Sequence, residues 1–160
     1  MLATLDILQN EKVKLIPFQY EGDFDYLIGI AMKYKYNITP KNMFLSLLKQ
    51  YGVAFWNGYM ENGVKGGVAY VCYYPEIGRY TFDAYRDNDL CKQHNPKGDY
   101  SYEAGKLLVP YILRNIANIL YTTHSIENRV ATIMCKRLGF KIVEITDTIL
   151  GRFIVLKTGG

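Results

Sequence analysis

The chain has 160 residues, of which 49% are hydrophobic and 21% are charged, a balance typical of globular proteins and not of disordered chains. No apolar run approaches the roughly 20 residues of a membrane-spanning helix, and the lysines and arginines behind the net charge of +4 are scattered, so no basic segment indicates a nucleic-acid surface. The first residues lack a basic leader and a cleavage site. We therefore expect one domain, in the cytoplasm, with no membrane contact.

The N-terminal third predicts one clear strand and two helices. Met1 to Asn10 fits a helical turn or an extra strand, and Val13 to Phe18 alternates as a strand does. Phe24 to Met32 keeps the i, i+3, i+4, i+7 spacing of an amphipathic helix. Thr39 and Pro40 indicate the start of a second helix, because proline is tolerated in a first turn. This helix is expected to bury Met43, Phe44, Leu47, Leu48 and Tyr51.

The pattern then changes from helical spacing to alternation and predicts three strands. Glu61 to Gly63 and Pro75 to Gly78 are turn sequences. Strands joined by such short turns pair antiparallel. We expect a meander formed by Val53 to Tyr59, Lys65 to Tyr74 and Arg79 to Tyr85.

The C-terminal half predicts a polar loop, two helices and three strands. Arg86 to Tyr100 is the loop, Ser101 can cap the helix that follows, and Pro110 inside that helix predicts a kink or a break. Ile119 to Thr123 is a short strand. The segments expected after the last helix are two strands and a loose tail: Lys141 to Ile145, Arg152 to Leu156 and Thr158 to Gly160.

The last helix has clear start and stop signals. Asn128 is a good N-cap, since its side-chain oxygen can accept from the free amides of the first turn. Gly139 can take the left-handed conformation that ends a helix, and Phe140 then folds back. The residues at helical spacing that we expect to be buried are Val130, Ile133, Met134 and Leu138.

Asn128, Ala131 one turn later, and the closing Leu138, Gly139 and Phe140 resemble the C-terminal motif of the GCN5-related N-acetyltransferases (GNAT). The order of the predicted elements is also similar to that family. The resemblance implies a single α/β domain over residues 1–160, with a mixed, mainly antiparallel sheet of about seven strands flanked by four helices. It further implies that the family's fourth and fifth strands splay apart, with acetyl-CoA between them. These strands are Arg79 to Tyr85 and Ile119 to Thr123 here.

The same resemblance assigns the residues that hold acetyl-CoA. Backbone amides of the fourth strand, at Ala84, Tyr85 and Arg86, would pair with the cofactor. The helix start at Asn128 and Ala131 would lie beside its pantetheine and adenosine end.

The family's pyrophosphate loop is only partly matched. Gly98 stands at the loop's first glycine and Lys97 beside it, where glycines let the backbone approach an anion. Asn95 replaces the family's Arg or Gln, and Tyr100 replaces a second small residue.

Two proton-transfer roles are implied by the resemblance. Asp83, within the fourth strand, is the best candidate for the base that takes a proton from the acceptor amine, ahead of Glu61 and Glu76. Cys135 stands where many members carry the tyrosine that protonates the departing thiolate. The tyrosines that could substitute for it are Tyr121, Tyr111 and Tyr85. His94 and His124 are lone histidines, expected at the surface or at a helix start.

The function implied is acetyl-CoA-dependent N-acetyltransfer to a primary amine of a small molecule or peptide, by direct attack in a ternary complex. The alternative is a non-catalytic protein that keeps the fold for binding or assembly, as a phage or viral protein could. The altered phosphate loop and the cysteine at position 135 favour this alternative. A homodimer or another assembly partner is compatible with both.

Overall fold

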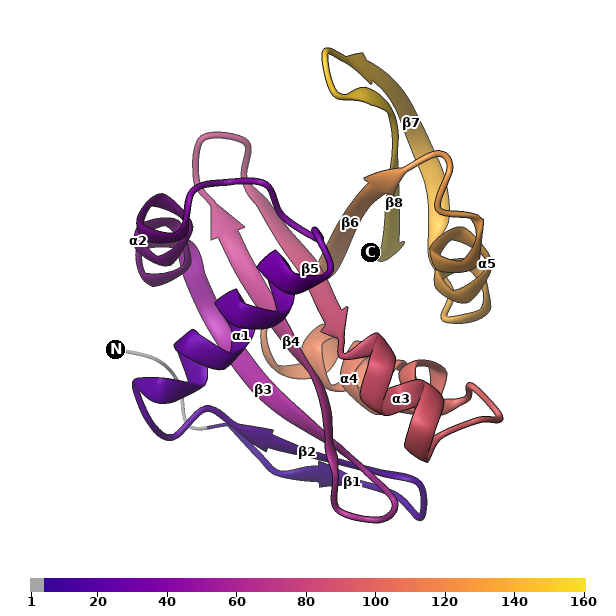
Figure 1. Cartoon of the computed structure of the whole chain (residues 1–160). Coiled ribbons are helices and arrows are strands. Elements are labelled where there is room, and N and C mark those ends of the chain that lie inside the picture. Colours follow the sequence, from indigo (N-terminus) through magenta and orange to yellow (C-terminus); the bar gives the residue numbers. More distant parts are fainter. Residues whose placement is uncertain (1–4) are drawn as a thin grey trace.

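The structure is a computed structural model that describes residues 5–160 (Figure 1). Its elements in chain order are β1 (Leu8–Gln9), β2 (Val13–Pro17), α1 (Gly22–Lys33), α2 (Lys41–Tyr51), β3 (Gly52–Met60), β4 (Lys65–Tyr74), β5 (Arg79–Arg86), α3 (Asn88–His94), α4 (Tyr100–Asn115), β6 (Ile119–Ser125), α5 (Arg129–Arg137), β7 (Lys141–Thr148) and β8 (Gly151–Gly159).

All the strands belong to one sheet with the order β1-β2-β3-β4-β5-β6-β8-β7. Neighbouring strands are antiparallel except β5 and β6, which are parallel. The predicted mixed, mainly antiparallel α/β sheet is confirmed. The described residues form eight strands and five helices, one more of each than expected, because Leu8–Gln9 adds a short strand and Asn88–His94 forms an extra helix.

The central meander β3-β4-β5 matches the prediction to within one residue at each end. The turn from Pro75 to Gly78 sets the register of β4 and β5, so that Tyr74 lies opposite Arg79 and Tyr70 lies opposite Asp83. Because side chains alternate along a strand, the turn decides which side chains of the two strands share a face.

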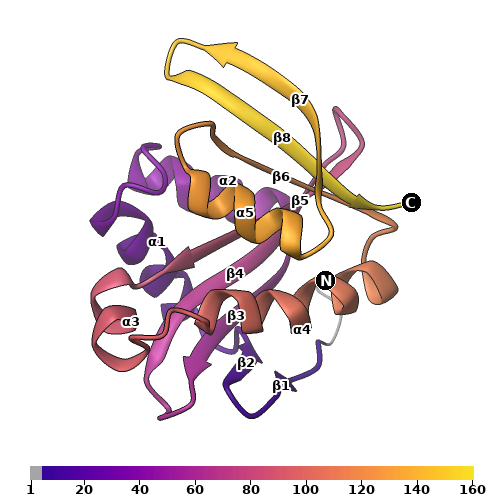
Figure 2. The same ribbon diagram turned by 90° about the vertical axis from the view of Figure 1, so that its right-hand side faces the viewer.

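β5 and β6 are paired over two positions only. Tyr80 is matched to Leu120 and Thr81 to Tyr121, and beyond them the strands diverge. The outer edge of β5 therefore has no strand partner from Phe82 to Arg86, which confirms the predicted splay. Figures 1 and 2 show the sheet opening here, with α5 beside the opening and the β7–β8 hairpin extending past it.

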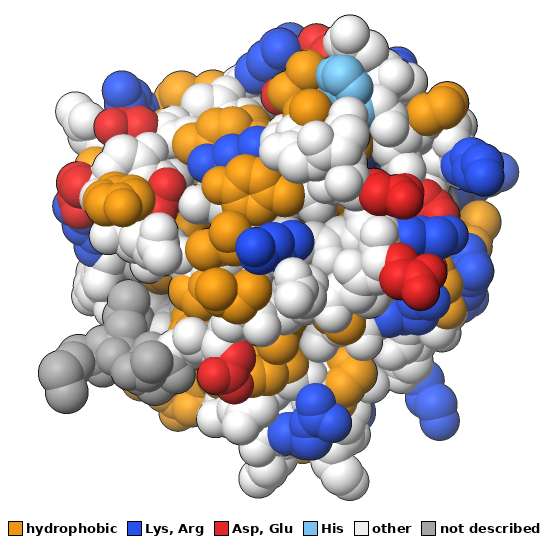
Figure 3. All heavy atoms as spheres, turned by 90° about the horizontal axis from the view of Figure 1, so that it is seen from below, with side chains coloured by type: hydrophobic (Ala, Val, Ile, Leu, Met, Phe, Trp, Pro, Cys, Tyr) orange, Lys and Arg blue, Asp and Glu red, His pale blue; other side chains and the backbone are white. Residues whose placement is uncertain are grey.

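Helices cover both faces of the sheet. α1 and α2 lie on one face (Figure 1), where Leu27, Phe44 and Leu48 pack on Phe55 and Tyr70. α4 lies on the other face (Figure 2), where its Leu108 and Ile112 belong to the same core cluster as Trp56 of β3 and Leu120 of β6. None of the helices described between residues 5 and 160 is both long and apolar enough to cross a bilayer. Lys and Arg side chains are dispersed among other residue types on the face drawn in Figure 3.

Three predictions about the segments around α4 were wrong. The expected loop contains α3, because Asp87 caps it by accepting from the Leu90 amide and Cys91 is buried beneath it. α4 begins at Tyr100 with Asp99 and not Ser101 as its N-cap, and it continues past the exposed Pro110 without the break that was one of the two outcomes predicted there. The expected loose tail is instead the end of β8, where Thr158 pairs with Leu120 of β6.

The signals predicted for α5 are confirmed, but its buried stripe is not. The Asn128 side chain accepts from the Ala131 amide at 3.2 Å, and Gly139 has φ +97°. Val130 and Ile133 are 67% and 60% exposed, because α5 borders an opening in the sheet, whereas Cys135 and the adjoining Leu138 pack against the core. On α2, Met43 and Leu47 are likewise more exposed than expected, at 58% and 37%.

Candidate active site

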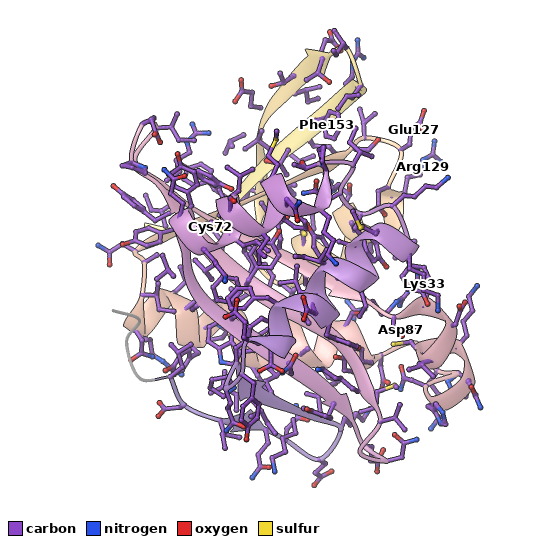
Figure 4. All side chains as sticks on the ribbon, turned by 60° about the vertical axis from the view of Figure 1, so that its left-hand side comes forward. Lys33, Cys72, Asp87, Glu127, Arg129 and Phe153 are labelled. Atoms are coloured by element: carbon purple, nitrogen blue, oxygen red, sulfur yellow. The ribbon has the colours of Figure 1, made fainter. Side chains whose placement is uncertain are left out.

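A cavity of about 950 Å³ occupies the opening between β5 and β6. It extends from the α1–α2 connection, across the face of β4 and β5, to α4, β6, α5 and the turn end of the β7–β8 hairpin. Two of its lining residues mark its opposite sides in Figure 4, Cys72 on β4 and Phe153 on β8. One continuous space is therefore bounded by the unpaired edge of β5, by parts of α2, α4 and α5, and by a connecting loop.

Asp83 of β5 lines this cavity and is only partly exposed. Desolvation by burial raises the pKa of its carboxyl group to about 6, although a hydrogen bond with Tyr70 opposes the shift. A carboxyl group with a pKa near neutrality can accept a proton and release it again at physiological pH. Asp83 thus stays the candidate for a general base, by its place in the cavity and by its acidity.

Tyrosines surround Asp83 on the same face of the sheet. The hydroxyls of Tyr70 and Tyr85 are 2.8 Å apart and hydrogen-bonded, and burial raises the pKa of both, so both rings stay neutral. The ring of Tyr36 stacks on that of Tyr85, with 5.1 Å between centroids and 4° between planes. The base candidate lies in an aromatic wall and not on an open, solvated strand.

The end of α1 holds Tyr36 in this wall. Lys35 has φ +56°, a left-handed conformation rarely adopted by residues other than glycine, and the following Tyr36 amide donates back to the Ala31 carbonyl. The Tyr36 hydroxyl then donates to the Arg86 carbonyl oxygen at 2.9 Å. The α1–α2 connection is thereby tied to the end of β5.

Cys135 of α5 lines the cavity opposite β5. Burial raises the pKa of its thiol to about 11, so the group is protonated at neutral pH. Tyr121, in contrast, is not among the cavity-lining residues, because its ring lies under the guanidinium of Arg79, 4.3 Å from the ring centroid. Of the four acid candidates chosen from sequence, the structure brings Cys135 and Tyr85 to the cavity, while Tyr121 and Tyr111 lie outside its lining.

The other predicted site residues fall into two groups, those that line the cavity and those that do not. Those that line the cavity are Ala84, Tyr85, Arg86, Asn128 and Ala131. Lys97 and Gly98 do not line it, and Gly98 instead closes a turn by donating its amide to the Asn95 carbonyl. Glu61 and Glu76 are also outside the lining.

The N-terminus of α4 is already engaged by side chains of the chain itself. The Asn95 side chain accepts from the Tyr100 amide and donates to the Asp99 carboxylate. The same carboxylate accepts from Lys12 at 2.6 Å, a hydrogen bond that lowers the pKa of Asp99. A carboxylate at this helix end works against an anionic ligand there.

His124 belongs to β6 and lines the cavity, and it meets the start of α5 only through its side chain, as the predicted helix-start partner. Its Nε2 lies 2.8 Å from the Thr132 hydroxyl in the first turn of α5. Burial lowers the pKa of the imidazole, so this ring is neutral at physiological pH and adds no charge to the cavity.

Comparison with solved structures gives matches over nearly the whole chain. A GNAT-family acetyltransferase from Bordetella pertussis has a TM-score of 0.72 at 13% identity, covering 97% of this chain and 100% of that one. The ribosomal α-N-protein acetyltransferase RimL, in complex with coenzyme A through a disulfide with one of its cysteines, has a TM-score of 0.67 at 12% identity, covering 96% and 98%. A mutant of the spermidine N-acetyltransferase SpeG from Vibrio cholerae has a TM-score of 0.66 at 10% identity, covering 94% of this chain and 95% of that one.

This chain has the GNAT fold. The likeness is one of architecture, since no family model and no curated protein sequence matches the chain. The GNAT fold accounts for the parallel, splayed β5–β6 pair within an otherwise antiparallel sheet.

The GNAT-fold cavity fits one part of acetyl-CoA better than the other. The unpaired β5 edge and the adjoining small side chain of Ala84 leave backbone groups accessible to the amides of a pantetheine arm. The α4 N-terminus, which would face the pyrophosphate, carries Asp99. The fit is therefore supported at the thioester end and weaker at the phosphate end.

Sequence reasoning missed Tyr70 and Tyr36, two of the three tyrosines described around Asp83. Tyr70 could have been found, because the Pro75–Gly78 turn places it opposite Asp83 once the hairpin register is counted. Tyr36 had no local signal, since its position depends on the left-handed Lys35 and on contacts with β5.

Proposed function

We propose that this protein is an acetyl-CoA-dependent N-acetyltransferase that acts on a primary amine by direct attack in a ternary complex. The observation that carries the proposal is the position of Asp83, in a cavity that also borders the unpaired edge of β5. A proton acceptor and a backbone edge suited to a pantetheine arm thus share one space. Structures with this fold include a coenzyme A complex and acetyltransferases of a protein and of spermidine, which supports the assignment.

Acetyl-CoA, when bound, supplies an acetyl group activated as a thioester. The β5 edge from Phe82 to Arg86 would hold its pantetheine arm, with Asn128 and Ala131 at the start of α5 on the other side. Asp83 would take a proton from the acceptor amine as the new carbon–nitrogen bond forms. The protonated Cys135 thiol would supply a proton to the sulfur released when the carbon–sulfur bond breaks.

The competing function is that of a non-catalytic protein with this fold, and Asp99 at the start of α4 favours it. Two measurements on the full chain separate the functions. A ligand present at 100 times its dissociation constant stabilises a protein by about 2.7 kcal/mol, so millimolar acetyl-CoA should raise Tm if the cavity binds it. Release of free coenzyme A thiol, dependent on an added amine, would then demonstrate transfer. No Tm shift at millimolar acetyl-CoA would reject the enzyme.

A further inference from the structure

We infer that the acceptor site selects a primary amine with a single basic nitrogen carried on an apolar or aromatic body. This inference rests on the proposed acetyltransferase function and names the class of its acceptor. It comes from the charges and the side chains on the Asp83 side of the cavity.

The charged side chains that line the cavity can neutralise one cationic group of an acceptor. Among the described residues that line the cavity, Asp83 alone carries a carboxylate. The other charged side chains of the lining are Lys35 and Arg86, and both are cationic. A second ammonium group on the acceptor would find no anion there and would be repelled by these two residues. A polyamine is therefore poorly matched to this site.

The walls beside Asp83 are apolar and incompletely covered. Ile38 and Leu47 line the cavity and are 70% and 37% exposed. Leu47 belongs to the stripe of α2 that its spacing predicts to be buried. Its partial exposure follows from its position at the cavity wall, where the apolar part of an acceptor could cover it together with Phe44 and Tyr74.

The aromatic wall is fixed before any ligand arrives. Tyr36 stacks on Tyr85 and its hydroxyl is hydrogen-bonded to the Arg86 carbonyl and to the Asn88 side chain. Rings held in this way accept an apolar or aromatic body at little further entropic cost. A long, flexible chain loses more conformational entropy on such a wall than a compact aromatic amine does.

The test compares acceptors at saturating acetyl-CoA with the full-length protein. The four amines are 2-phenylethylamine, a short peptide that begins with phenylalanine, spermidine, and an N-terminally blocked peptide with one internal lysine. The first two distinguish a free amine from a peptide N-terminus, and both have a single amine beside an aromatic ring. We expect kcat/KM for at least one of them to exceed that for spermidine and for the lysine peptide by tenfold or more. Equal or better turnover of spermidine or the lysine peptide would overturn the inference.

A matched pair of variants on α2 tests the charge argument. Leu47→Asp places a second carboxylate at the cavity wall, whereas Met43→Asp places one on the same helix outside the lining, at a residue 58% exposed. Leu47→Asp should raise the spermidine to phenylethylamine ratio of kcat/KM by about tenfold, and Met43→Asp should leave it unchanged. A ratio that moves equally in both variants, or in neither, contradicts the proposed site.

Binding separates this inference from the proposed function. Calorimetry in the presence of coenzyme A measures amine affinity without turnover. If phenylethylamine binds more tightly than spermidine but no amine is acetylated, the enzymatic function fails and the selectivity of the site stands. If acetylation occurs without this preference, or if neither amine binds, the selectivity is wrong.

Discussion

Asp83 lies directly opposite Tyr70 in the register of β4 and β5, inside the cavity that both residues line. The pairing places a carboxylate among buried phenols, where desolvation outweighs the hydrogen bond from Tyr70 and raises the pKa of Asp83 to about 6. The same environment therefore makes the Asp83 carboxylate a better base at neutral pH, and it makes the ionised side chain destabilise the folded protein.

Replacement of Asp83 by Asn should remove the base and its pH dependence together. A positioned general base contributes about 10²- to 10⁴-fold to rate, so we expect kcat/KM to fall by that range. In the wild type, kcat/KM should rise as pH increases through about 6, where Asp83 ionises, and this limb should be absent in Asp83→Asn. Glu61→Gln and Glu76→Gln change residues outside the cavity lining. Both variants should retain the wild-type kcat/KM and its rise with pH through about 6. Retention of the limb in Asp83→Asn would rule Asp83 out as the base.

The same substitution should stabilise the fold at high pH. The folded-state pKa of about 6 lies above the ordinary carboxyl pKa of 3.8, so the unfolded state ionises first and the free energy of unfolding falls as pH rises from about 4 to 6. Above pH 6 the destabilisation by the ionised Asp83 carboxylate is constant. At about 1.4 kcal/mol per pKa unit, Asp83→Asn should add up to about 3 kcal/mol at pH 8 and little at pH 4. Urea unfolding at the two pH values measures the difference, and an equal effect at both would contradict it.

Much of the fold could be predicted because its signals are local. The change from helical spacing to alternation gave the β3-β4-β5 meander, and Asn128 and Gly139 gave the ends of α5. α3 was missed because its apolar contacts come from little more than Leu90 and Cys91 in a polar segment. Val130 was misjudged because helical spacing identifies an apolar side but not whether a sheet or an opening faces it.

The site was less predictable because it depends on which way side chains point after the chain has folded. Asp83 was chosen by its position in a strand and Cys135 by its position in a motif, and both line the cavity. Tyr121 was also chosen from sequence, but its ring lies under the guanidinium of Arg79 and outside the cavity lining. No sequence pattern reports such a contact.

Cys135 should act as a proton donor and not as a reactive thiol. With a pKa of about 11, it should react slowly with iodoacetamide at pH 7.5, because the thiolate is the nucleophile. Cys135→Ala should lower kcat by about 100-fold. Cys91→Ala removes another buried thiol that does not line the cavity, and it should cost stability while leaving kcat unchanged. Similar kcat values for the two variants would assign Cys135 a packing role only.

Gly58 should tolerate a side chain only if the Tyr100 hydroxyl is removed. A Cβ at Gly58 would lie 2.1 Å from the Tyr100 hydroxyl oxygen, whereas the next nearest atoms are 3.3 Å or more away. Gly58→Ala should therefore destabilise the fold by about 1–3 kcal/mol. The same change in a Tyr100→Phe background should cost markedly less, as a double-mutant cycle of urea unfolding would show. Gly22→Ala, where a Cβ has no neighbour within 4 Å, is the control, and strict additivity would contradict the predicted clash.

Asp99 should weaken acetyl-CoA binding if the phosphates lie at the start of α4. The Asp99→Asn change removes the negative charge at that helix end and frees Lys12, whose ammonium group now pairs with the carboxylate at 2.6 Å. Both effects favour an anion, and a charge at a helix terminus is worth a few tenths to one kcal/mol. We expect the Kd for acetyl-CoA to fall by about two- to fivefold, with the larger change at low salt.

The control for Asp99 is Asp147→Asn, because Asp147 is also an exposed carboxylate in an ion pair, with Arg152 on the β7–β8 hairpin at 2.7 Å. Its removal changes the net charge of the protein by the same amount at a distant place, so it should leave the Kd nearly unchanged. Calorimetry with acetyl-CoA and with dephospho-CoA compares the two variants. Equal Kd changes would mean that only the overall charge of the protein matters, and an unchanged Kd in Asp99→Asn would place the pyrophosphate away from α4.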